Sequence, residues 1–311
     1  MGTAELACAS LAALAEFPRT RILGVVTQPD RPQGRNLKLQ APPVKRAARE
    51  RGLPVLQPDR ARDPDFVAKL AALAPDLIVV AAYGQILPAS ILELPPHGCL
   101  NVHTSLLPHY RGAAPIQWAI LNGDTTTGVT LMRINEQLDA GDIIAQCTLP
   151  IGPDETAETL HQRLALAGAR LLVESLPDYL EGRTTPRPQP DTGISYAPKI
   201  RKDDGRVDWT LTGWQLYNRF RAFTPWPGSF TFLPATPQPL RVRIWQAQVA
   251  DASGPPGTVL QAGPNLLRVA CGAAALDLLS LQREGGRSLA AREFLAGHPI
   301  PVGASLLNCA R

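Results

Sequence analysis

The sequence predicts an α/β domain with a doubly wound, mostly parallel, Rossmann-like sheet, followed by a smaller β-barrel domain. A chain of 311 residues is long enough for two domains. Apolar strand-like runs alternate with helical stretches up to about residue 182, which is typical of a doubly wound sheet. After residue 205, short strand-like runs follow one another at regular spacing, and this pattern favours a small barrel.

The elements of the first domain follow from apolar runs and their boundaries. The run over 76–82 is the clearest strand, because it is rich in β-branched and apolar residues. A helix is expected after the proline pair 42–43, since proline suits the first helical position, and Gly52 should end it. The expected strands are 22–27, 76–82, 99–102, 128–134 and 143–150, and the expected helices are 44–50, 64–73, 114–121 and 156–181.

The composition changes after residue 182. We assign residues 1–182 to a catalytic domain, 183–204 to a basic, proline-rich linker and 205–311 to a C-terminal domain. The C-terminal elements are a helix over 214–223 and strands near 229–233, 240–250, 256–261, 266–271 and 275–282.

Composition excludes several classes of protein. Hydrophobic residues make up 45% of the chain and charged residues 19%, so the chain is not wholly disordered. No apolar run is long enough for a membrane span, and the first residues lack the basic segment of a secretory signal. The five cysteines are scattered without a paired spacing, so we expect them to be reduced and to bind no metal. We therefore expect a cytoplasmic protein that does not contact membranes.

Charge is distributed unevenly. Residues 19–62 contain 11 basic and 3 acidic side chains, whereas residues 63–182 contain 5 basic and 14 acidic ones. A basic segment next to an acidic one suits a polyanion that is held beside a catalytic pocket. Solvated helix faces would give the same counts, and the sequence leaves both interpretations open.

The candidate chemistry follows the strand over 99–102. Asn101 and His103 should point to the same side of this strand, because strand side chains alternate. An amide and an imidazole at this spacing can both reach one carbonyl oxygen. Asp139 lies in a polar turn where its carboxylate could partner the histidine. Alone, His103 would fit a packed histidine and Asp139 an ordinary turn residue. Dinucleotide, P-loop and serine-hydrolase motifs are absent from the sequence.

Four short motifs together resemble the folate-dependent formyltransferase family. They are Asn101-x-His103, Ser105-Leu-Leu-Pro108, Arg111-Gly-Ala-Ala-Pro115 and Leu138-Asp139-x-Gly141-Asp142. The segments 27–35, 81–88 and 221–228 narrow the resemblance to members that act on methionyl initiator tRNA. The resemblance covers essentially the whole chain.

The resemblance implies a reaction and a set of residues. A formyl group would pass from (6R)-10-formyltetrahydrofolate to the α-amine of methionine on initiator tRNA, without a metal. Asn101 and His103 would donate hydrogen bonds to the formyl oxygen, and Asp139 would orient His103. The expected folate-binding residues are Gln85, Ile86, Leu87, Ser105, Leu106, Leu107, Pro108, Asn135 and Leu138.

The resemblance also implies where tRNA binds. The polar loop near residues 30–39 resembles the family's insertion into the end of the acceptor stem, with Arg35 as its main contact. This chain has Asn36 where the family usually has glycine. The second domain would be an OB-type barrel that contacts the tRNA backbone. The expected tRNA-binding residues are Arg31, Arg35, Lys38, Lys199, Arg201 and Lys202.

Two alternatives to the tRNA substrate stay open. The chain could formylate a small amine, such as a sugar nucleotide or glycinamide ribonucleotide, or it could bind RNA without catalysis. The C-terminal domain and the Arg35 loop favour tRNA over a small amine, and the complete Asn-His-Asp set argues against a non-catalytic protein. We expect a monomer. Family members begin with an apolar strand before a Gly-Thr-Pro turn, whereas this chain opens at Met1-Gly2-Thr3, so we expect its natural reading frame to start upstream.

Overall fold

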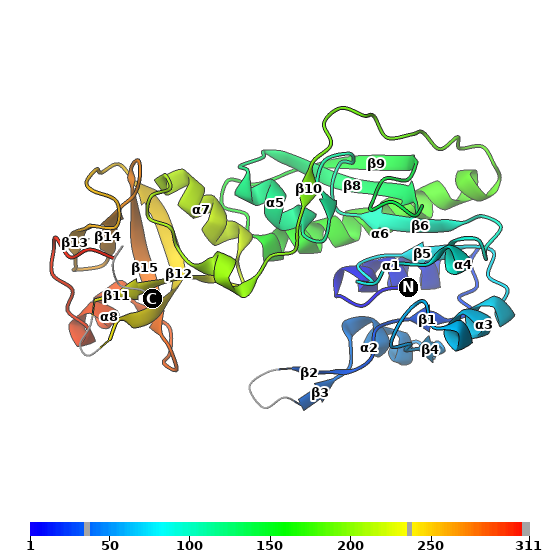
Figure 1. The fold of residues 1–311 in the computed structure, drawn as a ribbon, viewed down its shortest axis with the longest axis horizontal. Coiled ribbons are helices and arrows are strands. Elements are labelled where there is room, and N and C mark those ends of the chain that lie inside the picture. Colours follow the sequence, from blue (N-terminus) through cyan, green and yellow to red (C-terminus); the bar gives the residue numbers. More distant parts are fainter. Residues whose placement is uncertain (34–37, 235–237, 307–311) are drawn as a thin grey trace. The chain divides into compact units, whose positions relative to one another are not determined.

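The structure is a computed structural model that describes residues 1–33, 38–234 and 238–306. Its residues form two compact units (Figure 1). Unit 1 consists of Met1–Pro115, Thr126–Ile151 and Thr159–Pro198, and unit 2 consists of Ile116–Thr125, Gly152–Glu158 and Lys199–Arg311. Residues 183–198 therefore pack with unit 1. The domain boundaries that we assigned from the sequence stay predictions.

A four-stranded mixed sheet organises unit 1. Its order is β5 (Ile78–Val80), β6 (Cys99–His103), β8 (Thr126–Arg133) and β9 (Ile143–Pro150). Only β5 and β6 are parallel, while β8 runs antiparallel to both β6 and β9. The expectation of a mostly parallel sheet is therefore wrong for this half. The connection over 134–142 is too short for the crossover that a parallel pair needs.

Helix α6 (Ala157–Leu180) packs against this sheet. A Cβ at Gly168 would clash with Val102 of β6, and it would also press on Val129 of β8. Glycine at this position thus allows a close approach of helix and sheet. The long helix agrees with the one expected over 156–181.

The N-terminal half of unit 1 contains a second, parallel pair of strands. β1 (Val25–Val26) pairs with β4 (Val55–Leu56). Met1 and Gly2 lie between β1 and β5: the main-chain amide of Gly2 donates to the oxygen of Val26, and the Met1 oxygen accepts from Ala81. A cavity of about 600 Å³ lies beside these two residues. The helices of this half are α1 (Leu6–Glu16), α2 (Pro43–Glu50), α3 (Pro64–Ala72) and α4 (Ala89–Leu92).

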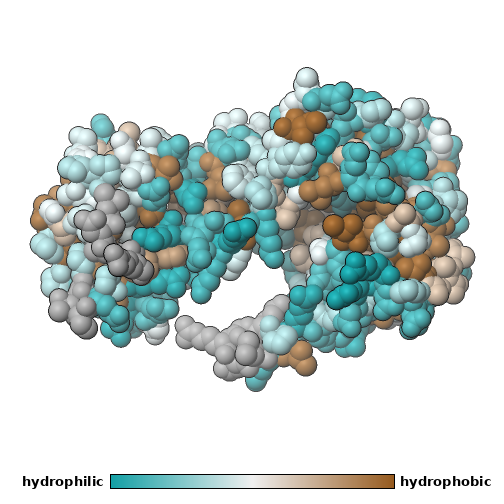
Figure 2. Space-filling model, in the orientation of Figure 1, coloured by the Kyte–Doolittle hydropathy of each residue, from teal (hydrophilic) through white to brown (hydrophobic). Residues whose placement is uncertain are grey.

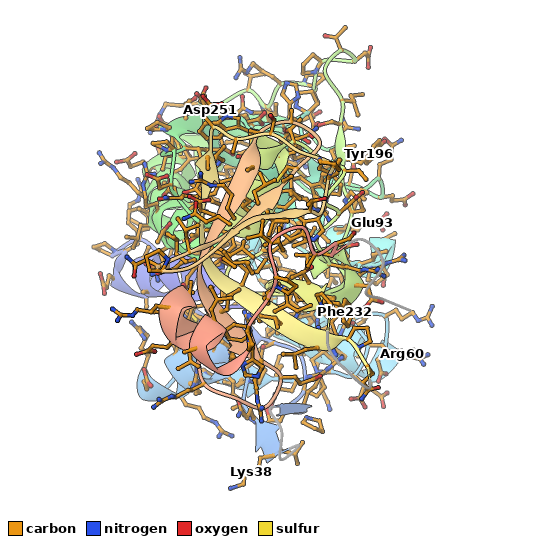
Figure 3. All side chains as sticks on the ribbon, turned by 90° about the vertical axis from the view of Figure 1, so that its left-hand side faces the viewer. Lys38, Arg60, Glu93, Tyr196, Phe232 and Asp251 are labelled. Atoms are coloured by element: carbon orange, nitrogen blue, oxygen red, sulfur yellow. The ribbon has the colours of Figure 1, made fainter. Side chains whose placement is uncertain are left out.

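The polar loop near residues 30–39 forms part of a hairpin. Strand β2 (Arg31–Gln33) pairs antiparallel with β3 (Lys38–Gln40). The polar composition of this segment predicts a loop, so the two strands differ from that expectation. Lys38 points away from the body of the protein in Figure 3. Arg35 and Asn36 lie outside the described residues.

Two very short strands hold the segment after α6 against unit 1. β7 (Arg111–Gly112) pairs in parallel with β10 (Tyr196–Ala197). The amide of Tyr110 also donates a 2.9 Å hydrogen bond to Oγ of Ser195. Helix α5 (Pro115–Leu121) follows β7 directly. This pairing places residues 183–198 next to the loop that follows β6.

Unit 2 is an antiparallel β-structure with helices. The order is β11 (Ser229–Leu233), β12 (Leu240–Ala250), β15 (Ala275–Arg283), β14 (Leu267–Ala270) and β13 (Val259–Ala262), and β16 (Leu289–Ala290) pairs with β15. These strands agree with the expected ones. Trp209, Leu278 and Phe294 belong to its buried core. The remaining elements are a 3₁₀ turn over Lys202–Gly205, α7 (Gly213–Ala222) and α8 (Ala291–Gly297).

The surface in view in Figure 2 is mostly hydrophilic, with smaller hydrophobic patches between the polar residues. Within the parts of the chain that the structure describes, every helix is too short or too polar to cross a membrane.

Candidate active site

Asn101, His103 and Asp139 come together at the end of β6. Nδ2 of Asn101 lies 3.4 Å from Oδ1 of Asp139. Nδ1 of His103 lies 3.7 Å from Oδ2 of the same carboxylate. The His103 side chain is 6% exposed and that of Asp139 is 15% exposed. The structure thus brings together the three residues that the sequence predicts. The Asn101 amide and the His103 imidazole both face the carboxylate of Asp139.

The contacts of His103 determine where its protons sit. Its Nε2 lies 3.0 Å from the main-chain oxygen of Tyr110. A carbonyl oxygen can only accept, so Nε2 must carry the hydrogen. Nδ1, which faces Asp139, can then donate only when the ring is protonated on both nitrogens.

The turn that carries Asp139 has an uncommon backbone conformation. Asp139 has φ +46°, in the left-handed region that few residues other than glycine adopt readily. Oδ2 of Asp139 accepts a 2.8 Å hydrogen bond from the amide of Gly112. A Cβ at Gly141 would overlap the main-chain oxygen of Arg133, so the turn requires glycine there. These contacts fix the carboxylate next to His103.

The segment from Ser105 to Pro108 is mostly internal. Ser105, Leu107 and Pro108 are buried, whereas Leu106 is half-buried. The Ser105 oxygen accepts from Oγ1 of Thr130, and the same hydroxyl accepts from the Leu107 amide. These contacts anchor the loop to β8. A role of these four residues in folate binding stays a prediction.

The other expected folate-binding residues differ in exposure: Ile86, Asn135 and Leu138 are exposed, Gln85 is half-buried and Leu87 is buried. The Gln85 side chain accepts from the Ala61 amide and donates to the Asp59 oxygen. Ile86 is 86% exposed and Leu138 is 58% exposed, although both side chains are apolar. Leu87 is buried, and Asn135 caps its own turn by accepting from the Gln137 amide.

The expected tRNA-binding residues lie at the surface in both units. Arg31 and Lys38 are exposed on the β2–β3 hairpin of unit 1. Lys199, Arg201 and Lys202 are exposed at the start of unit 2. Their roles in tRNA binding stay predictions.

Three further arginines of unit 2 have partners within the unit. Arg268 forms two hydrogen bonds with the buried carboxylate of Asp277, at 2.6 and 2.8 Å. The guanidinium of Arg241 lies 4.0 Å from the ring centroid of Phe230, and that of Arg243 lies 4.1 Å from Trp245. Arg268 therefore has a structural partner, as an ordinary arginine of a β-sheet would.

Cys99, the cysteine nearest in sequence to Asn101 and His103, is poorly suited to act as a nucleophile. The four described cysteines are free thiols. Burial raises the pKa of Cys99, the cysteine on β6, to about 12. A thiol with such a pKa stays protonated at neutral pH and is a poor nucleophile.

Sequence reasoning missed one set of residues around Asp139. Nε2 of Gln189 donates to the main-chain oxygens of Asp139 and Gly141, at 2.8 and 2.9 Å. Nε and a terminal nitrogen of Arg111 donate to Oε1 of Gln189, at 3.0 and 2.7 Å. Gln189 belongs to the proline-rich segment, where no periodic pattern could have revealed it.

Comparison with known families places this site in a family of enzymes. The family model described as "Formyl transferase" matches residues 2–176, and the model of its C-terminal domain matches residues 199–299. The chain belongs to the formyl transferase family.

Curated relatives match over nearly their whole length. A protein named methionyl-tRNA formyltransferase from Myxococcus xanthus is 52% identical over 303 residues, covering 97% of this chain and 95% of the relative. A protein of the same name from Geobacter sulfurreducens is 46% identical, covering 98% of this chain and 95% of the relative.

Solved structures of other proteins share the fold. An N-formyltransferase from Helicobacter canadensis, in complex with folinic acid and dTDP-3-aminofucose, has a TM-score of 0.64 at 17% identity, covering 91% of this chain and 97% of that one. HypX from Aquifex aeolicus, in complex with tetrahydrofolic acid, has a TM-score of 0.58 at 22% identity, covering 81% of this chain and 44% of that one.

Proposed function

We propose that this formyl transferase moves a formyl group from (6R)-10-formyltetrahydrofolate to the α-amine of methionine on initiator tRNA. The observation that carries the proposal is the meeting of Asn101, His103 and Asp139 at one strand end, at 3.4 and 3.7 Å. The name of the relatives that match nearly the whole chain supports the acceptor.

The three residues have distinct roles in this proposal. Negative charge develops on the formyl oxygen as the amine attacks, so donors aimed at this oxygen lower the barrier. Nδ2 of Asn101 supplies one donor, and Nε2 of His103 supplies the second by exchanging its contact with the Tyr110 oxygen for the formyl oxygen. Asp139 orients the ring through the contact at Nδ1. Its carboxylate has further lone pairs that can accept the amine's proton through a water molecule.

The turns beside the three residues fit a flat, hydrogen-bonding heterocycle. The exposed side chains of Ile86 and Leu138 offer apolar contact, and the main chain around each offers donors and acceptors. Gln85 supports the first turn through its bonds to residues 59 and 61. We assign the pterin to these two turns, because binding sites combine apolar walls with a few fixed polar groups.

The basic residues and unit 2 would hold the tRNA. Five antiparallel strands in the order β11-β12-β15-β14-β13 support an OB-type barrel. Lys199, Arg201 and Lys202 are exposed where this unit begins, and they would contact phosphates without reading sequence. Arg31, Arg35 and Lys38 would contact the acceptor stem. The protein would act in the cytoplasm as a monomer.

The reaction can be tested with three acceptors. Purified protein is mixed with 10-formyltetrahydrofolate and methionyl initiator tRNA, methionyl elongator tRNA or an amino sugar nucleotide. We expect rapid formylation of the initiator tRNA, slower formylation of the elongator tRNA and none of the sugar nucleotide. Formylation of the sugar nucleotide alone would replace the proposed acceptor with a small amine. No transfer to any acceptor would overturn the proposal.

A further inference from the structure

We propose that Gln189 is a positioning residue that sets the orientation of the Asp139 carboxylate through the main chain of its turn. The inference rests on the proposed function, because it assigns a role in that reaction. It is carried by the hydrogen bonds of a single side chain between the 139–141 turn and β7.

The amide of Gln189 is fully used. Its nitrogen donates to the main-chain oxygens of Asp139 and Gly141, at 2.8 and 2.9 Å. Its oxygen accepts from two nitrogens of Arg111, at 3.0 and 2.7 Å. A primary amide has two donor hydrogens and an oxygen with two lone pairs, so every hydrogen-bonding position has a partner. A side chain held at four points has one orientation.

The turn that Gln189 holds needs external support. Asp139 has φ +46°, a conformation that residues with a Cβ adopt only where their surroundings stabilise it. The turn lies outside the regular hydrogen bonding of β8 and β9. Gln189 forms hydrogen bonds to the residues before and after Ala140. These bonds therefore oppose a change in the backbone conformation of the turn.

The same short strand also holds the Asp139 carboxylate. Gly112 donates its amide to Oδ2 at 2.8 Å, and the side chain of its neighbour Arg111 holds Gln189. β7 thus fixes Asp139 twice, once at the carboxylate and once at the main chain. Loss of either contact would let the carboxylate turn away from His103.

The test changes one atom of Gln189. Gln189→Glu keeps an acceptor for Arg111 but removes both donors to the turn. We expect kcat for formyl transfer to fall between about 10-fold and 100-fold, because a misplacement of about 1 Å can cost about 10²-fold. KM for tRNA should stay within about twofold, since Gln189 touches neither proposed substrate. Gln162→Glu, on the exposed face of α6, makes the same change away from the site and should have no effect.

A second readout does not depend on activity. Amide hydrogen exchange of the peptide that contains Gly112 should become at least about tenfold faster in Gln189→Glu and unchanged in Gln162→Glu, because the acceptor on Asp139 becomes mobile. Arg111→Lys, which cannot offer the two-pronged contact, should reproduce both effects if Gln189→Glu fails to fold. A folded variant with wild-type kcat, or with unchanged exchange at Gly112, would overturn the inference. Absence of formyl transfer by the wild type would instead count against the proposed function. Amide hydrogen exchange at Gly112 would still test whether Gln189 holds the Asp139 turn.

Discussion

The main-chain amide of Gly112 donates a 2.8 Å hydrogen bond to Oδ2 of Asp139, joining β7 to a turn 27 residues later in the sequence. The same oxygen lies 3.7 Å from Nδ1 of His103. Gly112 therefore fixes the position of the carboxylate oxygen that faces His103, although it has no side chain.

Removal of the Asn101 amide should slow the chemical step. We expect Asn101→Ala to lower kcat by about 10²–10³-fold, which corresponds to about 2.7–4 kcal/mol, as is typical of a lost donor to a developing oxyanion. KM for either substrate should change little, because the donor acts mainly in the transition state. Steady-state kinetics with initiator methionyl-tRNA measures both values. A fall in kcat/KM caused by KM alone would assign Asn101 to substrate binding.

The exposed basic residues at the start of unit 2 should affect the binding of tRNA and not the chemical step. We expect the triple change Lys199→Ala, Arg201→Ala and Lys202→Ala to raise KM for tRNA, because phosphate contacts strengthen binding of every tRNA about equally. The slope of log Kd against log salt should fall by about one for each lost contact. Arg170→Ala, an exposed change on α6, is the matched control. An unchanged salt slope in the triple variant would exclude these residues from the interface.

The buried amino terminus should make stability depend on pH in a chain that begins at Met1. Burial lowers the pKa of the Met1 amine from 8.0 to about 6, although the amine also donates to the Val79 oxygen at 2.5 Å. The unfolded chain then binds more protons than the folded one between pH 6 and 8, so stability rises with pH across this window. Two pKa units correspond to a gain of about 2–3 kcal/mol. Urea unfolding from pH 5.5 to 8.5 measures the trend, and acetylation of the amine should abolish it. A flat profile in the unmodified chain would contradict the prediction.

An apolar extension of Met1 should stabilise unit 1. Met1 and Gly2 already bond to β1 and β5, and the cavity of about 600 Å³ beside them is lined by residues such as Leu11, Leu23 and Val79. Adding Val-Ile-Val-Ile before Met1 would continue this parallel pairing and bury apolar side chains. We expect the free energy of unfolding to rise by about 1–3 kcal/mol after the loss of chain entropy. An extension of four alternating Pro and Ser residues, which offers fewer amides and less apolar surface, is the control. Equal stability of the two extended chains would show that the cavity does not accept a strand.

Much of the fold was predictable because it follows from local patterns. The strand over Cys99–His103 and the helix over Ala157–Leu180 agree with apolar runs of the expected period. The strands Arg111–Gly112 and Tyr196–Ala197 were not predictable, since two-residue strands carry no periodic signal and form only through each other. The antiparallel direction of Thr126–Arg133 also depends on pairing rather than on composition.

The candidate site was predictable only in part. Spacing along one strand placed Asn101 and His103 together, and the family motifs supplied Asp139. The contacts of Gln189 lie in a segment whose prolines and polar residues suggested only a linker. Its position depends on β7 and β10, which the sequence did not reveal. Residues that act through a neighbour's main chain leave no pattern that sequence analysis can use.

The proposed mechanism assigns two roles to Asp139, and the decisive measurement is kcat of Asp139→Ala under saturating 10-formyltetrahydrofolate and initiator methionyl-tRNA. Circular dichroism establishes that the variant is folded. We predict that kcat falls by about 10²–10⁴-fold, as expected for the loss of a group that both orients an imidazolium and moves a proton, while Kd for tRNA stays close to that of the wild type. A folded Asp139→Ala protein with wild-type turnover would contradict the account.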